Sequence, residues 1–322
     1  MIPDFLIRAD SQDVTAVIRD RFMELRVTDV SGVDSDTVEI RLDDRAPAIA
    51  LPRTGAKLEV YLGYRETGLA RMGLFTVDEI TLEGPPDSLA IRARAADLRQ
   101  GLKEPRTRSF DNIRIGDLVS TIAAAHGYTP QVAPDLAALS LVHLDQTEES
   151  DLNLLTRLAE DHGAVAKPMA DALLFVPRGQ AKSFSGKALP VVTKGRGDLS
   201  RWNVTLAERN KYLAVEARWR DLAAAADVTI VVGSGEPVFR IRNSYPDAAT
   251  ALAAAKAKLA AFERGAGTLS GGCRGDISLG AEGELHLAGI RPGVDGKWTL
   301  RQVVHVIGDG GYSCEFEGEA GE

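Results

Sequence analysis

The chain has 322 residues, with 38 Lys and Arg against 46 Asp and Glu, so its formal net charge is −8. That balance excludes a generally basic nucleic-acid-binding protein and leaves only a local basic patch open. At roughly 100–200 residues per domain, the length predicts two or three domains. The 44% share of hydrophobic residues excludes a disordered chain.

The sequence carries no signal for membrane insertion or secretion. No apolar run approaches the ~18–20 residues that span a bilayer, and the first residues lack a basic region followed by an apolar core. We therefore expect synthesis and folding in a cytoplasm. The two cysteines, Cys273 and Cys314, have neither metal-ligand nor redox spacing, which predicts two buried thiols.

The first hundred residues are expected to form strands, because apolar and polar residues alternate there with a period of two. Turn residues, among them Gly84, Pro85 and Pro86, separate the runs. Several short strands at this spacing predict a small antiparallel barrel or sandwich over residues 1–105. The alternating residues are Met23, Leu25 and Val27; Val38, Ile40 and Leu42; Leu58, Val60 and Leu62; and Leu89, Ile91 and Ala93.

Residues 106–178 are expected to form an α+β insert, because the apolar spacing becomes helical near residue 110. Residues 115–123 predict one helix. A second helix is expected to be capped by Thr147 or Ser150 and to end at Gly163. Acidic residues lie in its first turn. Residues 172–176 are a further candidate strand.

Residues 179–322 return to the β pattern and are interrupted by one helix at about 246–264. Alternation over Leu213–Trp219 and the β-branched run Val228–Val232 predict strands. The helix is expected to start at a capping box formed by Ser244 and Asp247 and to stop at Gly265.

The two β regions share a pattern that suggests an internal duplication. Residues 55–62 align with residues 280–287, and residues 73–80 align with residues 296–303 at a nearly equal offset. Residues 73–80 and residues 296–303 both contain an aromatic residue followed by Thr and an aliphatic residue. An alternative explanation is that β-hairpins resemble one another in composition, since all share glycine turns and alternation.

No motif of a known catalytic mechanism occurs. The chain lacks the phosphate-binding G-x-x-x-x-G-K-[ST], the dinucleotide-binding G-x-G-x-x-G, the zinc-binding H-E-x-x-H and the nucleophile turn G-x-S-x-G. The histidines His126, His143 and His162 fall within the insert, but their separations match no common metal-ligand spacing. His286 and His305 are isolated from them. We expect structural roles for these side chains.

Paired carboxylates offer the one enzymatic alternative, a cell-wall glycosidase. Most of the pairs lie in expected turns or at a helix start, where acidic residues are favoured for local reasons. The tryptophans Trp202, Trp219 and Trp298 lie in alternating segments and are expected in the core. We predict no catalytic, cofactor-binding or metal-binding residues. The pairs are Asp34/Asp36, Asp43/Asp44, Asp78/Glu79 and Glu148/Glu149.

Several segments, in order along nearly the whole chain, resemble the late control protein D family of contractile-tailed phages. These baseplate hub proteins are similar to the N-terminal hub part of type VI secretion spike proteins. The most specific segment is Gln146-Thr147-Glu148-Glu149-Ser150-Asp151, which lies within His143–Leu152. The others are Ser35–Asp44, Leu62–Tyr64, Gly73–Ile80 with Gly84–Pro86, and Trp298 through His305 to Tyr312.

The resemblance implies a structural, non-enzymatic role without a cofactor. The implied fold is a β-rich α+β fold with two similar small antiparallel β-barrel tube domains flanking the insert. The implied assembly is a homotrimer that presents six similar units and adapts a hexameric tail tube to a trimeric spike. Expected partners are further copies of the chain, the tail tube protein, the spike protein, the tape-measure protein and other baseplate proteins.

The same resemblance implies a place in the baseplate of a virion tail or tail-like particle. Secretion relatives carry a C-terminal β-helical spike that this chain lacks, so the spike is expected to be a separate polypeptide. Sequence-specific nucleic-acid binding is not expected, and the negative charge suits a conduit to which DNA does not adhere. The alternatives left open are the cell-wall glycosidase of a tail and the hub of a secretion system.

Overall fold

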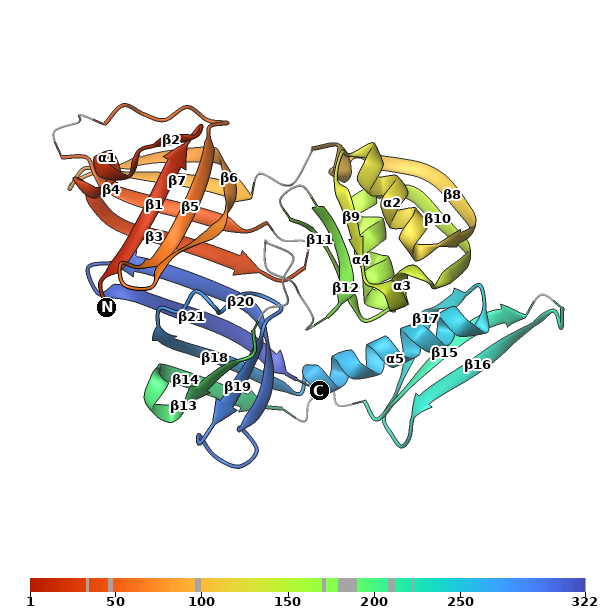
Figure 1. Cartoon of the computed structure of the whole chain (residues 1–322). Helices are drawn as coiled ribbons and strands as arrows, with labels where there is room; N and C mark the ends of the chain where they lie inside the picture. Colours follow the sequence, from red (N-terminus) through yellow and green to blue (C-terminus); the bar gives the residue numbers. More distant parts are fainter. Residues whose placement is uncertain are drawn as a thin grey trace. The chain divides into compact units, whose positions relative to one another are not determined.

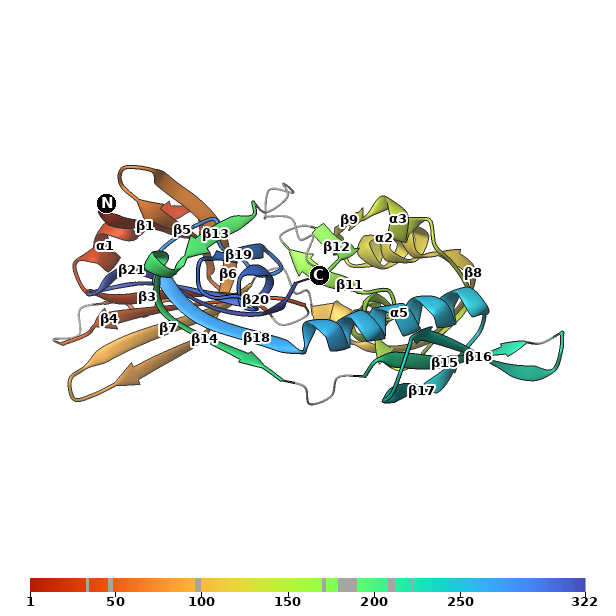
Figure 2. The ribbon, with the colours of Figure 1, turned by 90° about the horizontal axis from the view of Figure 1, so that it is seen from below.

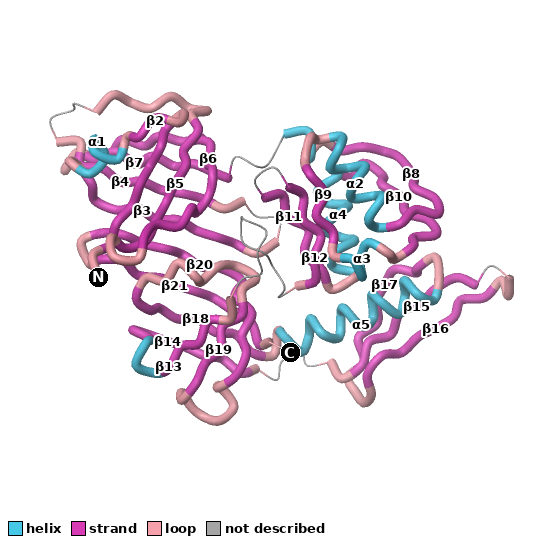
Figure 3. The backbone as a smooth tube through the Cα atoms, viewed as in Figure 1, coloured by secondary structure: helices cyan, strands magenta, loops and turns pink. Residues whose placement is uncertain are grey.

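The computed structural model describes residues 1–32, 35–45, 49–95, 100–169, 172–178, 190–207, 212–221 and 223–321 (Figure 1). The chain divides into two compact units. Unit 1 comprises Met1–Leu98, Lys182–Val204 and Leu269–Gly318. Unit 2 comprises Arg99–Ala181, Thr205–Thr268 and Glu319–Glu322. Unit 1 is built almost entirely of strands, and most of the helical residues lie in unit 2 (Figure 3).

A single 13-stranded sheet forms unit 1. Its order is β14-β18-β21-β20-β3-β4-β7-β6-β5-β1-β2, with β19 beside β20 and β13 beside β19. The strands of the first half are β1 (Pro3–Ala9), β2 (Gln12–Asp13), β3 (Phe22–Val30), β4 (Thr37–Asp43), β5 (Lys57–Tyr64), β6 (Gly68–Glu83) and β7 (Ser88–Ala95). Those of the second half are β13 (Val192–Gly195), β14 (Leu199–Leu206), β18 (Gly267–Arg274), β19 (Glu284–Ala288), β20 (Gly296–Gly308) and β21 (Gly311–Ala320). Two short helices accompany them, α1 (Thr15–Arg19) and η2 (Arg196–Asp198).

The two halves share one strand order. The first half runs β3-β4-β7-β6-β5-β1, and the second runs β14-β18-β21-β20-β19-β13. The strands correspond one to one in chain order except at the end, where β1 is antiparallel to β5 and β13 is parallel to β19. The halves join where β20 pairs with β3. In both hairpins the aromatic residue faces an aliphatic one, Phe75 opposite Leu58 and Trp298 opposite Leu285.

Strand alternation places the core of unit 1 on one face of the sheet. The expected rows of β4, β5 and β7 are all buried. The prediction that Met23 belongs to the buried row of β3 is wrong, because its side chain is exposed. A bulge between Phe22 and Glu24 interrupts the pairing with β4 at this point. Leu25 and Val27 after the bulge are buried as expected.

Unit 2 contains three small sheets. Their orders are β10-β8, β11-β12-β9 and β16-β15-β17. The strands are β8 (Pro105–Arg114), β9 (Thr129–Val132), β10 (Ser140–Ser150), β11 (Ala164–Met169), β12 (Ala172–Pro177), β15 (Ala214–Asp221), β16 (Ala226–Gly233) and β17 (Val238–Tyr245). The helices are η1 (Gln100–Lys103), α2 (Ile115–Ala125), α3 (Pro134–Ala137), α4 (Asp151–Asp161) and α5 (Ala248–Arg264).

The helices predicted from apolar spacing are present. Ser150 caps α4 by accepting a hydrogen bond from the Asn153 N–H, which selects it over Thr147. The expected start of α5 is wrong, because Asp247 itself is the capping residue and its carboxylate accepts from the Thr250 N–H. Ser244 lies in β17 instead. Helix α5 packs on the sheet of β15 through Ala251 and Ala255, among other residues (Figure 2).

The β-rich α+β class is thus confirmed, whereas the compact units follow a different division from the expected domains. Residues 205–268 belong to unit 2 with the insert, and residues 269–318 belong to unit 1 with the first half. The expected boundary after residue 178 borders residues that lie outside the described ranges. The three-domain division at 105/106 and 178/179 stays a prediction.

Candidate functional site

The most specific sequence segment, residues 146–151, builds a buried polar network in unit 2. Asp151 starts α4 and is fully buried. His126, at the end of α2, donates from Nε2 to its carboxylate at 2.8 Å, and Gln146 of β10 donates to it at 2.8 Å. Arg108 of β8 pairs with the same carboxylate and donates from Nε to the Gln146 side-chain oxygen at 2.7 Å. The network therefore fastens two helices to the antiparallel pair of β8 and β10.

Electrostatics keep this carboxylate charged. Burial alone raises the pKa of Asp151, but the hydrogen bonds from His126 and Gln146 and the charges of Arg108 and Arg106 hold that pKa below its ordinary value. The sequence pattern places Asp151 only in the acidic first turn of the helix. Alternation of Arg106 and Arg108 along the opposite strand was the available signal, since it places both guanidinium groups on one face.

The histidines of the insert lie in separate environments. His126 is part of the Asp151 network, whereas His143 is half-exposed and contacts Asp111 at 2.6 Å and Asp145 at 3.1 Å. Hydrogen bonds to these two carboxylates raise the pKa of His143. His162 follows α4, and burial lowers its pKa. Within the described ranges no three His, Cys, Asp or Glu side chains gather as a metal site.

Four carboxylates of the paired acidic residues form ion pairs with arginines. Asp43 pairs with Arg45, Asp78 with Arg94, Glu79 with Arg92 and Glu149 with Arg157. Asp44 is buried, Glu148 is exposed with a positive φ of 48°, and Asp34 lies outside the described residues. For the four ion-paired carboxylates the partner is a cation, which is the arrangement of a solvated, ion-paired surface.

The predicted core tryptophans differ in burial. Trp298 is buried and donates from Nε1 to the Val294 carbonyl at 3.0 Å. Trp202 is half-buried under the guanidinium of Arg196, and half-buried Trp219 packs on the core between β15 and α5.

The two thiols are buried and reduced, as predicted. Cys273 of β18 hydrogen-bonds with Cys314 of β21, and this contact together with burial raises the pKa of Cys314. Cys314 Sγ also lies 3.2 Å from Nδ1 of His305, which contacts the Tyr312 hydroxyl at 2.8 Å. The second half of the sheet thus has a neutral polar cluster in its interior.

Two grooves are candidates for binding. In unit 2, a groove of about 570 Å³ lies between β10, α4, β17 and α5. There the Tyr245 hydroxyl donates to Asp161 at 3.0 Å, and burial raises the pKa of Asp161.

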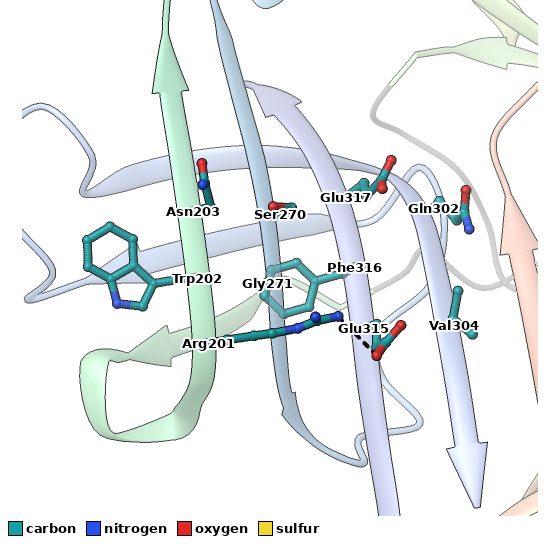
Figure 4. Close-up of a pocket in the computed structure, with 10 residues that line it drawn as sticks. All are labelled: Arg201, Trp202, Asn203, Ser270, Gly271, Gln302, Val304, Glu315, Phe316 and Glu317. Carbon is teal, nitrogen blue, oxygen red and sulfur yellow. Dashed lines mark ion pairs between the residues drawn. The ribbon is translucent and has the colours of Figure 1, made fainter.

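The second groove, about 450 Å³, crosses the polar face of β14, β18, β21 and β20 in unit 1 (Figure 4). Arg201 reaches across β18 to pair with Glu315 at 2.9 Å, and Gln302 and Glu317 also line the groove.

Ion pairs cover the corresponding face of the first half. Glu39 of β4 lies between Arg41 and Arg92, and Arg92 of β7 also reaches Glu79 of β6. The same row includes Arg26 of β3, which is opposite Glu39. Each half thus has a polar sheet face of mixed charge, and no catalytic group is assembled on it among the described residues. Such a face fits an assembly role.

Comparison with known proteins identifies the family. The family described as "Phage tail baseplate hub (GPD)" matches residues 37–311. The probable baseplate hub proteins of Escherichia phages P2 and 186 are each 32% identical to this chain. The matched regions cover 98% of this chain in both cases, 93% of the phage P2 protein and 92% of the phage 186 protein. The tail protein from Neisseria meningitidis MC58 has a TM-score of 0.74 at 12% identity, over 99% of this chain and 97% of that one.

These findings confirm the resemblance, the structural role and the location in a baseplate of a phage tail or tail-like particle, and they set aside the glycosidase alternative. Among the described residues no helix has the length and apolar character needed to cross a bilayer. The chain belongs to the phage tail baseplate hub family.

Proposed function

We propose that this hub protein is a homotrimer that adapts a hexameric tail tube to a trimeric spike. The observation that supports the proposal is the shared strand order of the two halves of the sheet, β3-β4-β7-β6-β5-β1 and β14-β18-β21-β20-β19-β13. Three chains with two such halves present six similar units. A ring of this kind matches sixfold symmetry on one side and threefold symmetry on the other.

In this proposal each half is one small β-barrel tube domain, and the two descend from a duplication. The pairs Phe75–Leu58 and Trp298–Leu285 place an aromatic and an aliphatic residue in corresponding hairpins. The inserted unit 2 lies outside the repeated pattern and supplies surface for other baseplate proteins. The partners are the tail tube protein, the spike protein and the tape-measure protein, and the polar sheet face is the candidate wall of the conduit.

Native mass spectrometry of the full chain, alone and with tube and spike proteins, tests the proposal. The expected result is a trimer, alone or in the complex, that binds one trimeric spike. A species that stays monomeric with both partners present overturns the adaptor role.

A further inference from the structure

The junction between the two halves is a strand pairing that buries its apolar side chains. Residues 302–308 of β20 pair antiparallel with residues 24–30 of β3. On β20 the side chains of Val303, His305 and Ile307 are buried there, and on β3 Leu25 and Val27 are buried. This edge of β20 is available to β3 because β19 pairs only with residues 296–299.

The corresponding edge of the first half has no such neighbour. Strand β6 pairs with β5 over residues 68–76, and Val77 exchanges backbone hydrogen bonds with Gly55 and Ala56. Beyond Val77, β7 occupies one edge of β6, and no described strand lies along the other. Residues 79–83 therefore occupy the position that residues 302–306 hold in the second half.

Burial differs accordingly at matched positions. Aligning Gly73 with Gly296 matches Ile80 to Val303 and Leu82 to His305. Val303 and His305 are each 0% exposed, whereas Ile80 is half-buried and Leu82 is 58% exposed. The pairing with β3 covers these positions in the second half. The first half lacks that cover.

The counterpart of β3 is β14, which ends the described sheet. Leu25 and Val27 of β3 are buried, but Trp202 and Val204 of β14 are half-buried, and Leu206 is 62% exposed. One half therefore exposes an apolar β6 edge, and the other exposes an apolar β14 edge. Apolar strand edges of this kind are templates for pairing with another chain.

Charge on the polar face is complementary between these edges. The row of alternating charges across β3, β4 and β7 ends on β6 at Glu79, whose side chain is 53% exposed. Exposed Glu83 lies four residue pairs further along the same strand, on the same face. On β14 the same face carries Arg201, which pairs with Glu315 within its own half but whose side chain is still 66% exposed. An acidic edge meeting a basic edge favours one partner and orientation.

We propose that residues 79–83 of β6 in one copy pair with β14 of the next copy, in the manner in which β20 pairs with β3 within the chain. The occupant of each open edge is a second copy of this chain. The contact is head-to-tail, and in the proposed homotrimer three such contacts close into a ring. This inference rests on the homotrimer of the proposed function and assigns the strands that form its interface.

Disulfide cross-linking of the full chain, in complex with tube and spike proteins where these are needed for assembly, tests the pairing. Ile80→Cys or Leu82→Cys is combined with Trp202→Cys, Val204→Cys or Leu206→Cys in one chain. Facing residues of paired antiparallel strands lie within the ~4.4–6.8 Å Cα separation of a disulfide. The native cysteines are buried, so only the introduced thiols are accessible. At least one combination is expected to give a covalent trimer under oxidation.

The matched control combines Leu82→Cys with Leu139→Cys, an exposed residue of unit 2, and is expected to give no covalent trimer. In parallel, Leu82→Asp and Leu206→Asp are each expected to lower the trimer fraction at least tenfold, whereas Leu51→Asp leaves it unchanged. Hydrogen exchange of unit 1 must stay native in each variant.

A trimer that forms without cross-linking in any combination overturns this interface and leaves the adaptor role standing. Absence of any trimer, even with both partners, overturns both. A folded Leu82→Asp variant that trimerises normally also contradicts the interface.

Discussion

The two halves of the unit 1 sheet have the same strand order but different interiors. In the first half the core rows of β4, β5 and β7 are purely apolar. In the second half His305, Tyr312, Cys273 and Cys314 lie together in the core, and glycines allow aromatic rings to approach the backbone. The shared order does not require a shared set of core residues. Alternation and strand order therefore define the architecture, and side-chain chemistry is free to differ.

The largest expected effect comes from emptying either hairpin core. Phe75→Ala and Trp298→Ala each remove a buried aromatic ring, and each is expected to cost about 3–5 kcal/mol of unfolding free energy. Because β20 pairs with β3, hydrogen exchange measured by mass spectrometry should increase throughout unit 1 in both variants. Exposed Leu51→Ala is the control. Loss of protection confined to the mutated half would show that the halves unfold independently.

Acidification is expected to act on the second half. Burial lowers the pKa of His305 from 6.5 to about 4. The folded state therefore binds fewer protons than the unfolded state between those values. The neutral His305 therefore leaves the free energy of unfolding undiminished above about pH 6.5. As the pH falls from 6.5 toward 4, the protonation of this residue in the unfolded state lowers the free energy of unfolding by about 3 kcal/mol in total. Asp29, Asp276, Tyr312 and Cys314 surround this ring.

Urea unfolding between pH 7 and 4, followed by hydrogen exchange of unit 1 peptides, measures this dependence. His305→Gln should reduce the pH dependence of the free energy of unfolding. The first half should show no such dependence at its matched position, because Leu82 has no titratable group. His162 also has a lowered pKa but lies in unit 2, so its peptides are read separately. An unchanged slope in folded His305→Gln would contradict the assignment.

Glycine packing gives the next effect. A Cβ at Gly275 would lie 2.1 Å from Tyr312 Cγ, and the Gly275 carbonyl accepts a hydrogen bond from the Tyr64 hydroxyl. Gly275→Ala is expected to cost about 1–3 kcal/mol through overpacking. Gly197→Ala is the control, because no atom lies within 4 Å of its Cβ position and its effect should stay within about 0.5 kcal/mol. Equal midpoints in urea for the two variants would contradict this prediction.

Surface charge should give the smallest effect. Burial pushes the pKa of Glu39 upward, but hydrogen bonds from Arg41 and Arg92 bring it below its ordinary value. Glu39→Gln is expected to cost at most about 1 kcal/mol, less in 1 M salt, because partly exposed pairs are screened. Glu315→Gln, which loses the ion pair with Arg201, should cost less still. A salt-independent loss in Glu39→Gln would indicate packing rather than charge.

Local patterns predicted much of this fold, because the forces that set them act between near neighbours. The row Val38, Ile40 and Leu42 and the Ser150 cap were readable for that reason. The division into units was not readable, since it depends on pairings such as β20 with β3 that join distant segments. The Asp151 network was missed for the same reason, because β8, α2 and α4 converge on it from separate parts of the chain.

The pairing of β20 with β3 also determines when unit 1 can finish folding. Residues 24–30 leave the ribosome long before their partner, residues 302–308, because more than 270 residues separate the two strands. Until β20 has been made, β3 presents an open edge to other nascent chains, and the long loop that must close slows the pairing of the two strands. Production of this protein in quantity therefore depends on protecting β3 until β20 has been made.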